Sequence, residues 1–224
     1  MDRKEIFDSQ FSKDFDSLLR RMDLSSWFRY YFIIKKVLEF KSESVLEIGI
    51  GDKIVKNCLK ESVDNYMTMD INQKLNPDIL SDLRNFHSEI KEKFDCVICS
   101  EVLEHIPFED IEKNLSNIFS YLKKDGKAVL TLPHRRARLM TITPLSYQKP
   151  VIITLPSWFK SSPGLFYRRF FKKEIWIDPE HCWEIGDGKI KIKDVEESFS
   201  KAGFKIKEFK KLLHVDLWIL EKQT

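Results

Sequence analysis

The chain has 224 residues, of which 42% are hydrophobic and 33% are charged, with a formal net charge of +3. This length and composition are typical of a soluble globular protein, so we expect residues 1–224 to form a single domain. The sequence shows no apolar run long enough to span a bilayer, and its charged start does not resemble a signal peptide. It therefore predicts a cytoplasmic protein.

Residues 1–42 are expected to form helices ahead of the first strand. Apolar side chains share one face of a predicted helix around residues 15–22. A second helix is predicted from about residue 27 to residue 40, with Ser25 or Ser26 as its N-cap. The many aromatic side chains of this helix favour packing against a sheet or over a site.

The central pattern is a strand, a glycine turn and a helix in residues 45–59. The apolar run that ends at Ile48 predicts a short buried strand. Gly49 and Gly51 follow it, and residues without a Cβ atom let the backbone turn sharply and approach a ligand. Asp70 ends the next predicted strand 19 residues beyond Gly51, a spacing that brings a carboxylate against a ribose in nucleotide-binding folds.

Strands and helices continue to alternate, which predicts a parallel sheet with helices on both faces. After the strand at 66–70, the predicted strands are 78–83, 94–99, 128–132, 204–209 and 215–220. Gly126 is expected to end the helix before the fifth strand in the left-handed conformation. Asp194 and Glu197 form the predicted capping box of the last helix, which should end at Gly203.

Cys96 and Cys99 form a Cys-x-x-Cys pair inside the predicted strand at 94–99. Side chains three positions apart in a strand point to opposite faces of the sheet. The sequence has no second pair of this kind to complete a zinc site. The two cysteines are therefore predicted to be buried, reduced thiols.

Small and polar residues collect at the carboxyl ends of the predicted strands. They are Gly49, Gly51, Asp70, Asp82, Ser100, Glu101 and Pro133. Ligands of doubly wound sheets bind at these ends, where the strand order reverses. The sequence therefore predicts a ligand site along this edge.

These motifs resemble those of the class I S-adenosylmethionine-dependent methyltransferases, especially the small single-domain members of types 11 and 23. Five motifs stand in the order of that family, at 45–51, 70, 82–83, 94–106 and 122–127. The resemblance implies a doubly wound, Rossmann-like α/β fold with seven strands. It also implies an antiparallel last strand, N-terminal helices and an insertion after the fifth strand.

The resemblance implies S-adenosylmethionine as the cofactor. Its predicted contacts are Glu47, Gly49, Gly51, Asp70, Ile71, Asp82, Leu83, Ser100 and Glu101. Asp70 would accept hydrogen bonds from the ribose hydroxyls, and Asp82 and Leu83 would flank the adenine. Lys53 departs from the family pattern, because a third glycine often stands at this position.

Residues 134–189 are expected to form a lid, because insertions at this point of the resembled fold cover the substrate. Residues 134–174 carry nine Arg or Lys residues and one acidic residue, interleaved with aromatic residues. This composition favours a phosphate-bearing, lipid-linked or RNA substrate, or contact with an anionic membrane surface. A solvated basic face is the alternative interpretation.

Three histidines fall where the acceptor pocket should lie: His105, His134 and His181. A hydroxyl acceptor is helped by a general base, and an imidazole with an ordinary pKa near ~6.5 suits that role. We predict His181 and His105 as the catalytic residues. His181 is preferred because its segment, 178–186, has a loop-like composition. That segment also resembles the His-x-Trp-Glu segment that some of these methyltransferases place beside the substrate.

The sequence leaves the presence of a metal open. Glu101, Glu104, His105 and His181 together resemble the metal site of small-RNA 2′-O-methyltransferases and could bind Mg²⁺ or Mn²⁺. However, the same Glu-Val-Leu-Glu-His run is widespread among relatives thought to need no metal.

The sequence thus predicts an S-adenosylmethionine-dependent methyltransferase that O-methylates a small-molecule or lipid-linked acceptor, such as a glycan or an isoprenoid precursor. The first alternative is an RNA 2′-O-methyltransferase with a Glu/His metal site. The second is a non-catalytic protein that binds the cofactor.

Overall fold

A computed structural model describes residues 23–135, 138–141, 151–154 and 177–223. The main sheet contains β1 (Ser44–Ile48), β2 (Asn65–Asp70), β3 (Ile79–Leu80), β4 (Phe94–Ser100), β5 (Leu122–Pro133), β8 (Phe204–Lys211) and β9 (Val215–Lys222). A separate hairpin consists of β6 (Arg138–Thr141) and β7 (Val151–Thr154). The α-helices are α3 (Leu24–Phe40), α4 (Ile54–Leu59), α5 (Ile111–Tyr121) and α7 (Ile192–Lys201). Short 3-10 helices are η1 (Gln73–Leu75), η2 (Ser88–Ile90), η3 (Leu103–His105) and η4 (Phe108–Asp110).

The seven strands of the main sheet lie in the order β3-β2-β1-β4-β5-β9-β8. The first five are parallel, and β9 runs antiparallel to both β5 and β8. The strands β1, β2 and β3 follow one another toward one edge of the sheet, and β4 then pairs with the other side of β1. The strand order therefore reverses between β1 and β4. The predicted Rossmann-like fold with an antiparallel last strand is confirmed.

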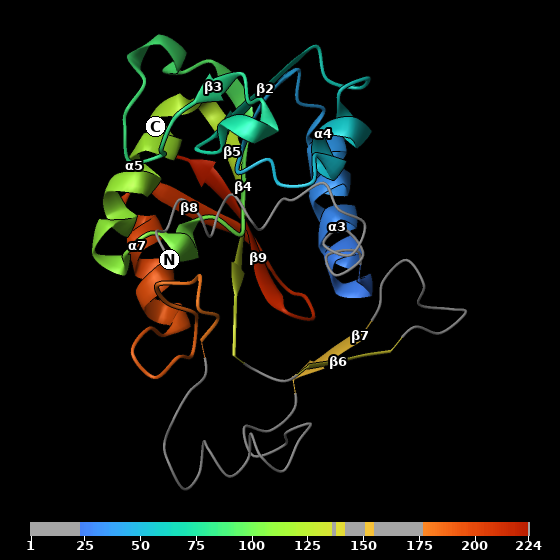
Figure 1. Cartoon of the computed structure of the whole chain (residues 1–224), viewed down its shortest axis with the longest axis vertical. Helices are drawn as coiled ribbons and strands as arrows, with labels where there is room; N and C mark the ends of the chain where they lie inside the picture. Colours follow the sequence, from blue (N-terminus) through green and yellow to red (C-terminus); the bar gives the residue numbers. More distant parts are fainter. Residues whose placement is uncertain (1–22, 136–137, 142–150, 155–176, 224) are drawn as a thin grey trace, which may run out of the picture.

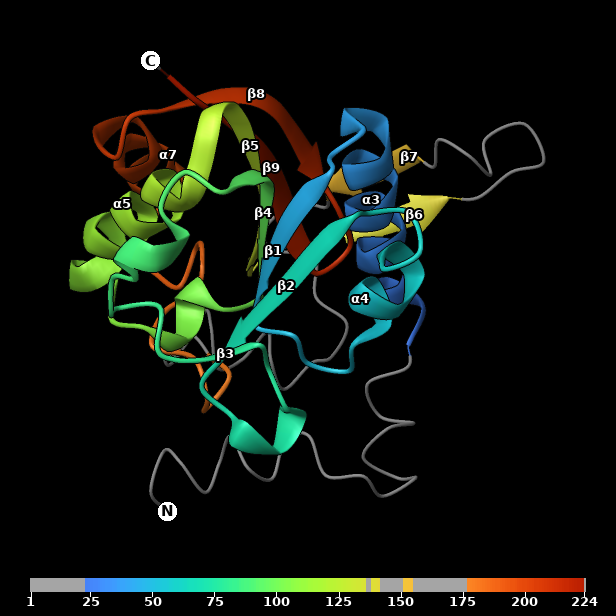
Figure 2. The ribbon, with the colours of Figure 1, turned by 90° about the horizontal axis from the view of Figure 1, so that it is seen from above.

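Helices cover both faces of the sheet (Figures 1 and 2). Helices α3 and α4 pack on one face, and α5 and α7 pack on the other. Residues of β4 are divided between the two cores: Cys96 belongs to the α3/α4 core and Cys99, three positions later, to the α5/α7 core. Both thiols are buried and unbonded to one another, as predicted, and burial raises the pKa of Cys96 to about 12.

Two predictions at the ends of helices are wrong in detail. Helix α3 is capped by Asp23 and not by a serine, because one Asp23 carboxylate oxygen accepts the backbone N–H groups of both Ser25 and Ser26. In α7 the N-cap is Lys191, and Asp194 stands three residues later, where it accepts the Lys191 N–H. Gly203 follows α7 at φ 92°, as predicted for the residue that ends this helix.

Two predictions around the strands also need correction. The third strand has two residues instead of six, because the carboxylates on either side of it bond elsewhere: Asp78 accepts from the backbone and side chain of Thr68, and Asp82 accepts the N–H of Arg84. Asp125, at φ 59°, takes the left-handed turn that was expected of Gly126. A Cβ atom on Gly126 would lie 2.9 Å from the carbonyl oxygen of Lys123, so close packing is the reason for this glycine.

Several predictions fall partly or wholly outside the described residues. The helix predicted around residues 15–22 lies there, and so does most of the basic part of the predicted lid. Within the described residues, no helix is both long and apolar enough to cross a membrane.

Candidate functional site

The carboxyl ends of the parallel strands gather the residues that the sequence analysis placed there. Gly49 directly follows β1, Asp70 ends β2, Ser100 ends β4 and Pro133 ends β5. Since β1 and β4 are neighbours at the reversal of the strand order, these residues meet at one edge of the sheet.

The glycine turn after β1 has a steric reason of its own. Gly49 adopts φ 77°, and a Cβ atom built on it would lie only 2.2 Å from the Cγ2 atom of Val102. The loop after β4 therefore packs directly on the turn after β1, which only a residue without a side chain permits. Gly51 and Lys53 also have positive φ values, 43° and 60°, and Lys53 is the N-cap residue of α4.

Asp70 ties the end of β2 to this turn. One carboxylate oxygen accepts the N–H of Ile50 at 2.9 Å, and the other accepts the N–H of Asn72 at 2.8 Å. Burial raises the pKa of Asp70, although these backbone hydrogen bonds oppose the effect. The adjacent Ile71 is 48% exposed and presents an apolar side chain to solvent beside the turn.

Asp82 and Leu83, the two residues predicted to flank the adenine, lie in different environments. The Asp82 carboxylate pairs with the Arg84 guanidinium through contacts of 2.6–3.0 Å. Partial burial of Asp82 opposes ionisation, but the hydrogen bonds from Arg84 outweigh it and lower the pKa of the carboxyl. Leu83, by contrast, is buried in the α5/α7 core, and its carbonyl oxygen accepts a hydrogen bond from Asn117.

Glu47 is buried within β1 rather than at its end. Its neighbours Leu46 and Ile48 belong to the α5/α7 core, and alternation along the strand places Glu47 on the opposite face, under α3 and α4. The Tyr66 hydroxyl donates a hydrogen bond of 2.9 Å to its carboxylate. Burial raises the pKa of Glu47 to about 8.

A polar network connects α3 with the end of β4. Arg29 donates a hydrogen bond of 2.7 Å to the Ser100 hydroxyl, which lies 2.8 Å from the Thr131 hydroxyl. Thr131 also contacts a carboxylate oxygen of Glu101 at 3.3 Å. Glu101 has a φ of 55°, a rare value for a residue with a side chain and one that is found at functional sites.

His105 and His181 meet although 75 residues separate them. Their ring centroids are 4.9 Å apart, with the rings nearly perpendicular. Three hydrogen bonds join the two segments: from the Cys182 N–H to the Glu104 carbonyl, from the Cys182 thiol to the His105 carbonyl, and from the Trp183 indole to the Ile106 carbonyl.

Glu184 positions the imidazole of His181. One Glu184 oxygen lies 2.9 Å from the Nδ1 atom of His181, and Arg135 forms an ion pair with the same carboxylate. Burial alone would lower the pKa of His181, but the bond to Glu184 outweighs it and raises that pKa. Trp183 is buried and stacks edge-on against Phe108, so it anchors the core beneath the histidines.

Glu104 lies beside the two histidines and is completely buried. Neither of its side-chain oxygens has a hydrogen-bond partner among the described residues. Burial raises the pKa of Glu104, and the negative charge of Glu101 raises it further. His134, the third predicted histidine, follows β5 at the same edge and is also buried.

The sequence analysis missed Arg29, Arg135 and Thr131 at this site. Arg29 lies in an aromatic helix far from the motifs, and nothing in the spacing of that helix indicates where its guanidinium would end. Thr131 could have been predicted from the sequence, because it lies among the last residues of a strand whose carboxyl end faces the site.

Comparison with known proteins identifies the family. The family model Methyltransf_23, described as a methyltransferase domain, matches residues 25–206. The chain belongs to the class I S-adenosylmethionine-dependent methyltransferases. The match covers most of the chain and includes every cofactor residue that the sequence analysis predicted.

Solved structures show the same fold at low sequence identity. The N-methyltransferase NodS from Bradyrhizobium japonicum, solved with S-adenosylhomocysteine, has a TM-score of 0.62, 11% identity and full coverage of both chains. The 1,6-didemethyltoxoflavin-N1-methyltransferase from Burkholderia thailandensis has a TM-score of 0.61 and 11% identity, and the alignment covers 99% of this chain and 87% of that one. Magnesium protoporphyrin IX methyltransferase from Synechocystis has a TM-score of 0.59 and 13% identity, with 99% and 94% covered. No curated protein is significantly similar to the chain in sequence.

The predicted family, fold and cofactor of this methyltransferase are thus confirmed. The roles of the individual site residues stay predictions, as do the division of the chain and the identity of the acceptor.

Proposed function

We propose that this methyltransferase transfers the methyl group of S-adenosylmethionine to a hydroxyl of a small or lipid-linked acceptor, such as a glycan or an isoprenoid precursor. The observation that carries the proposal is the pair of imidazoles, His105 and His181, with ring centroids 4.9 Å apart at the edge where the cofactor motifs meet. An alcohol is a weak nucleophile, and a neighbouring base that removes its proton is the help it needs.

In this proposal, different residues contact different parts of the cofactor. The turn at Gly49 and Gly51 admits the cofactor backbone closely, and Asp70 binds the ribose hydroxyls. Asp82 and Leu83 flank the adenine, Ile71 lies beside the ribose, and Ser100 and Glu101 lie toward the methionine end. Several solved structures of the same fold contain bound S-adenosylhomocysteine, which supports this assignment.

The chemical step is an in-line displacement at the methyl carbon. The acceptor oxygen forms a bond to the methyl group while the bond from that carbon to sulfur breaks, and the electron pair stays on sulfur as S-adenosylhomocysteine forms. The hydroxyl proton passes to the imidazole of His181. Glu184 holds Nδ1 of this ring as a hydrogen-bond donor, which leaves Nε2 to take the proton. Orientation of the two reactants supplies much of the rate.

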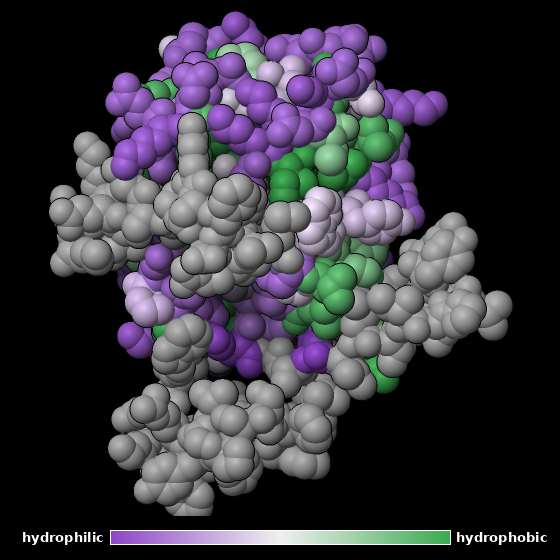
Figure 3. Space-filling model, turned by 45° about the vertical axis from the view of Figure 1, so that its right-hand side comes forward, coloured by the Kyte–Doolittle hydropathy of each residue, from purple (hydrophilic) through white to green (hydrophobic). Residues whose placement is uncertain are grey.

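A lipid-linked acceptor is favoured by the surface over α3. Leu24, Trp27 and Tyr31 recur at helical spacing along this helix, and their side chains are 42–79% exposed. Figure 3 shows hydrophobic side chains gathered in the middle of this side of the molecule. Val151 and Ile153 of the hairpin are also exposed, on the face of β7 opposite to Ile152.

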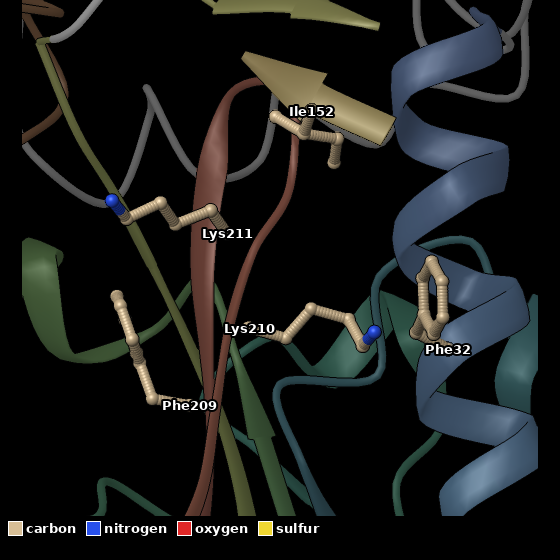
Figure 4. A pocket seen from close by; sticks show the side chains of 5 residues that line it. All are labelled: Phe32, Ile152, Phe209, Lys210 and Lys211. Carbon is tan, nitrogen blue, oxygen red and sulfur yellow. The ribbon is translucent and has the colours of Figure 1, made fainter. Parts of the chain in front are cut away.

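Basic side chains accompany these apolar residues. A pocket between α3, β7 and β8 is lined by Phe32, Ile152, Phe209, Lys210 and Lys211 (Figure 4). The Lys210 ammonium lies 4.6 Å from the centroid of the Phe32 ring, and Lys35 lies over Tyr31. Aromatic residues beside lysines are typical of surfaces that rest on anionic membranes, where a lipid-linked acceptor would be found.

Titration calorimetry with S-adenosylmethionine and S-adenosylhomocysteine tests the proposal. We expect both to bind, and Asp70→Ala to weaken binding about tenfold to a hundredfold, since hydrogen bonds to a charged group are lost. Asp64→Ala, at an exposed acid just before the same strand, is the matched control and should bind normally. The protein loaded with donor is then screened against alcohol acceptors for release of S-adenosylhomocysteine. Absence of binding by folded protein, or transfer only to amines, would overturn the proposal.

A further inference from the structure

Three potential metal ligands converge beside the acceptor edge. Glu104 and His105 come from η3, and His181 comes from the segment before α7, drawn in orange in Figure 1. Each side chain offers one ligand atom, and these atoms all lie within 4.8 Å of one another. A carboxylate and two imidazoles in this arrangement form one of the common ligand sets for first-row divalent cations.

The hydrogen bonds of both histidines prepare the ring nitrogens for a metal. Nδ1 of His105 lies 3.1 Å from the Glu180 carbonyl oxygen, and Nδ1 of His181 lies 2.9 Å from a Glu184 carboxylate oxygen. Because a carbonyl and a carboxylate only accept, each Nδ1 carries a proton, and in the neutral form of each ring the lone pair is on Nε2. Ligating histidines in metalloproteins are usually held in this way by a second partner.

Glu104 supplies the second, independent observation. Its side chain is 0% exposed, and both carboxylate oxygens have no hydrogen-bond partner among the described residues. A buried carboxylate without a partner costs several kcal/mol, and proteins usually avoid that cost by pairing it or placing a cation against it.

We propose that Glu104, His105 and His181 bind one divalent transition-metal cation. Two imidazole nitrogens and one carboxylate oxygen favour Mn²⁺, Fe²⁺, Co²⁺ or Zn²⁺ over Mg²⁺, which prefers oxygen ligands. The Glu101 carboxylate, held by Thr131 on the adjacent strand, adds negative charge beside the site.

The cation deepens the function proposed above and rests on it for its use in the reaction. With the cation bound, Nε2 of His181 is a ligand and does not accept the hydroxyl proton, which passes to solvent instead. Three protein ligands leave coordination positions open for an acceptor oxygen. A bound cation lowers the pKa of a coordinated hydroxyl and orients it toward the methyl group. Acceptors with two vicinal hydroxyls, which can occupy two such positions, are the substrate class that this arrangement favours.

Cobalt titration tests the metal site without a cofactor or an acceptor. Protein treated with EDTA and desalted is titrated with Co²⁺, whose visible absorption reports ligation by nitrogen and oxygen. We expect one equivalent to bind, and Glu104→Gln and His181→Asn each to weaken binding at least about tenfold, since loss of an outer-shell partner alone has that effect. No binding by the unaltered protein, or unchanged binding in both variants, would overturn the proposal.

Two controls keep the outcome interpretable. His87→Asn removes a histidine of a surface His–Glu pair, whose closest atoms are 2.7 Å apart, and should leave cobalt binding unchanged. If Glu104→Gln fails to fold, as judged by binding of S-adenosylhomocysteine, His181→Asn decides the question. Failure of the metal site would leave the calorimetric result intact, so the two proposals fail separately.

Discussion

At the scale of single residues, the turn after β1 shows how the chain departs from its family and keeps the family's backbone. Lys53 stands where relatives often have a third glycine, and it adopts φ 60° and ψ 15°. This left-handed conformation costs a residue with a side chain roughly 1 kcal/mol. The backbone of the turn is therefore that of the glycine motif, and only the side chain differs.

Replacement of Lys53 by glycine should stabilise the protein. We expect Lys53→Gly to raise the free energy of unfolding by about 0.5–1 kcal/mol, which corresponds to about 1–4 °C in the midpoint of thermal unfolding. Lys60→Gly is the matched control, because Lys60 ends the same helix at φ −56°, where glycine brings no relief and costs about 0.5–1 kcal/mol. Differential scanning calorimetry measures both, and a lower midpoint for Lys53→Gly would contradict the argument.

At the scale of secondary-structure elements, β1 carries one polar residue into an otherwise apolar layer. Glu47 lies between the sheet and the α3/α4 layer, with the Tyr66 hydroxyl of β2 as its partner. Burial in this layer raises the pKa of Glu47 to about 8, from 4.5 in an unfolded chain. The folded protein therefore keeps a proton on Glu47 at pH values where the unfolded chain has released it.

The stability of the protein should fall with pH because of Glu47. Below the unfolded pKa both states hold the proton and the stabilisation is fully present; it is lost as the pH rises through the folded pKa near 8. We expect Glu47→Gln to make the free energy of unfolding less dependent on pH, by an amount on the order of a few kcal/mol between pH 5 and pH 8. Urea unfolding at the two pH values measures this. Glu43→Gln, at an exposed position beside β1, should behave like the unaltered protein, and an equal effect of Glu47→Gln at both pH values would refute the assignment.

At the scale of the whole molecule, the proposed contact with a membrane depends on the exposed apolar side chains of α3 and the neighbouring lysines. The double variant Trp27→Ala/Tyr31→Ala should reduce cosedimentation with vesicles that contain anionic phospholipid by about tenfold. Phe86→Ala removes an aromatic residue of similar exposure elsewhere on the surface and serves as the control. Equal binding to vesicles of neutral lipid alone, or no binding to either, would argue against a lipid-linked acceptor.

Local patterns determined most of the fold. The apolar run of β1, the glycine turn and the acid that ends β2 were all predictable, because each depends on neighbouring residues and on a repeating geometry of the backbone. The opposite burial of Cys96 and Cys99 followed from the alternation of a strand alone. Errors were confined to ends and turns, such as the cap of α3 and the turn at Asp125, where two or three adjacent residues compete for the same hydrogen bonds.

The sequence by itself therefore determined the family, the succession of strands along the chain and the edge at which the cofactor motifs meet. Only the tertiary structure decided how the acceptor side of that edge is built. It brings His181 against His105, leaves Glu104 buried beside them without a hydrogen-bond partner among the described residues, and places Arg29 on Ser100. The physical reason is that these contacts join residues 71 and 76 positions apart in the sequence, through the packing of separate segments on one edge of the sheet. Periodicity within a segment carries no information about that packing.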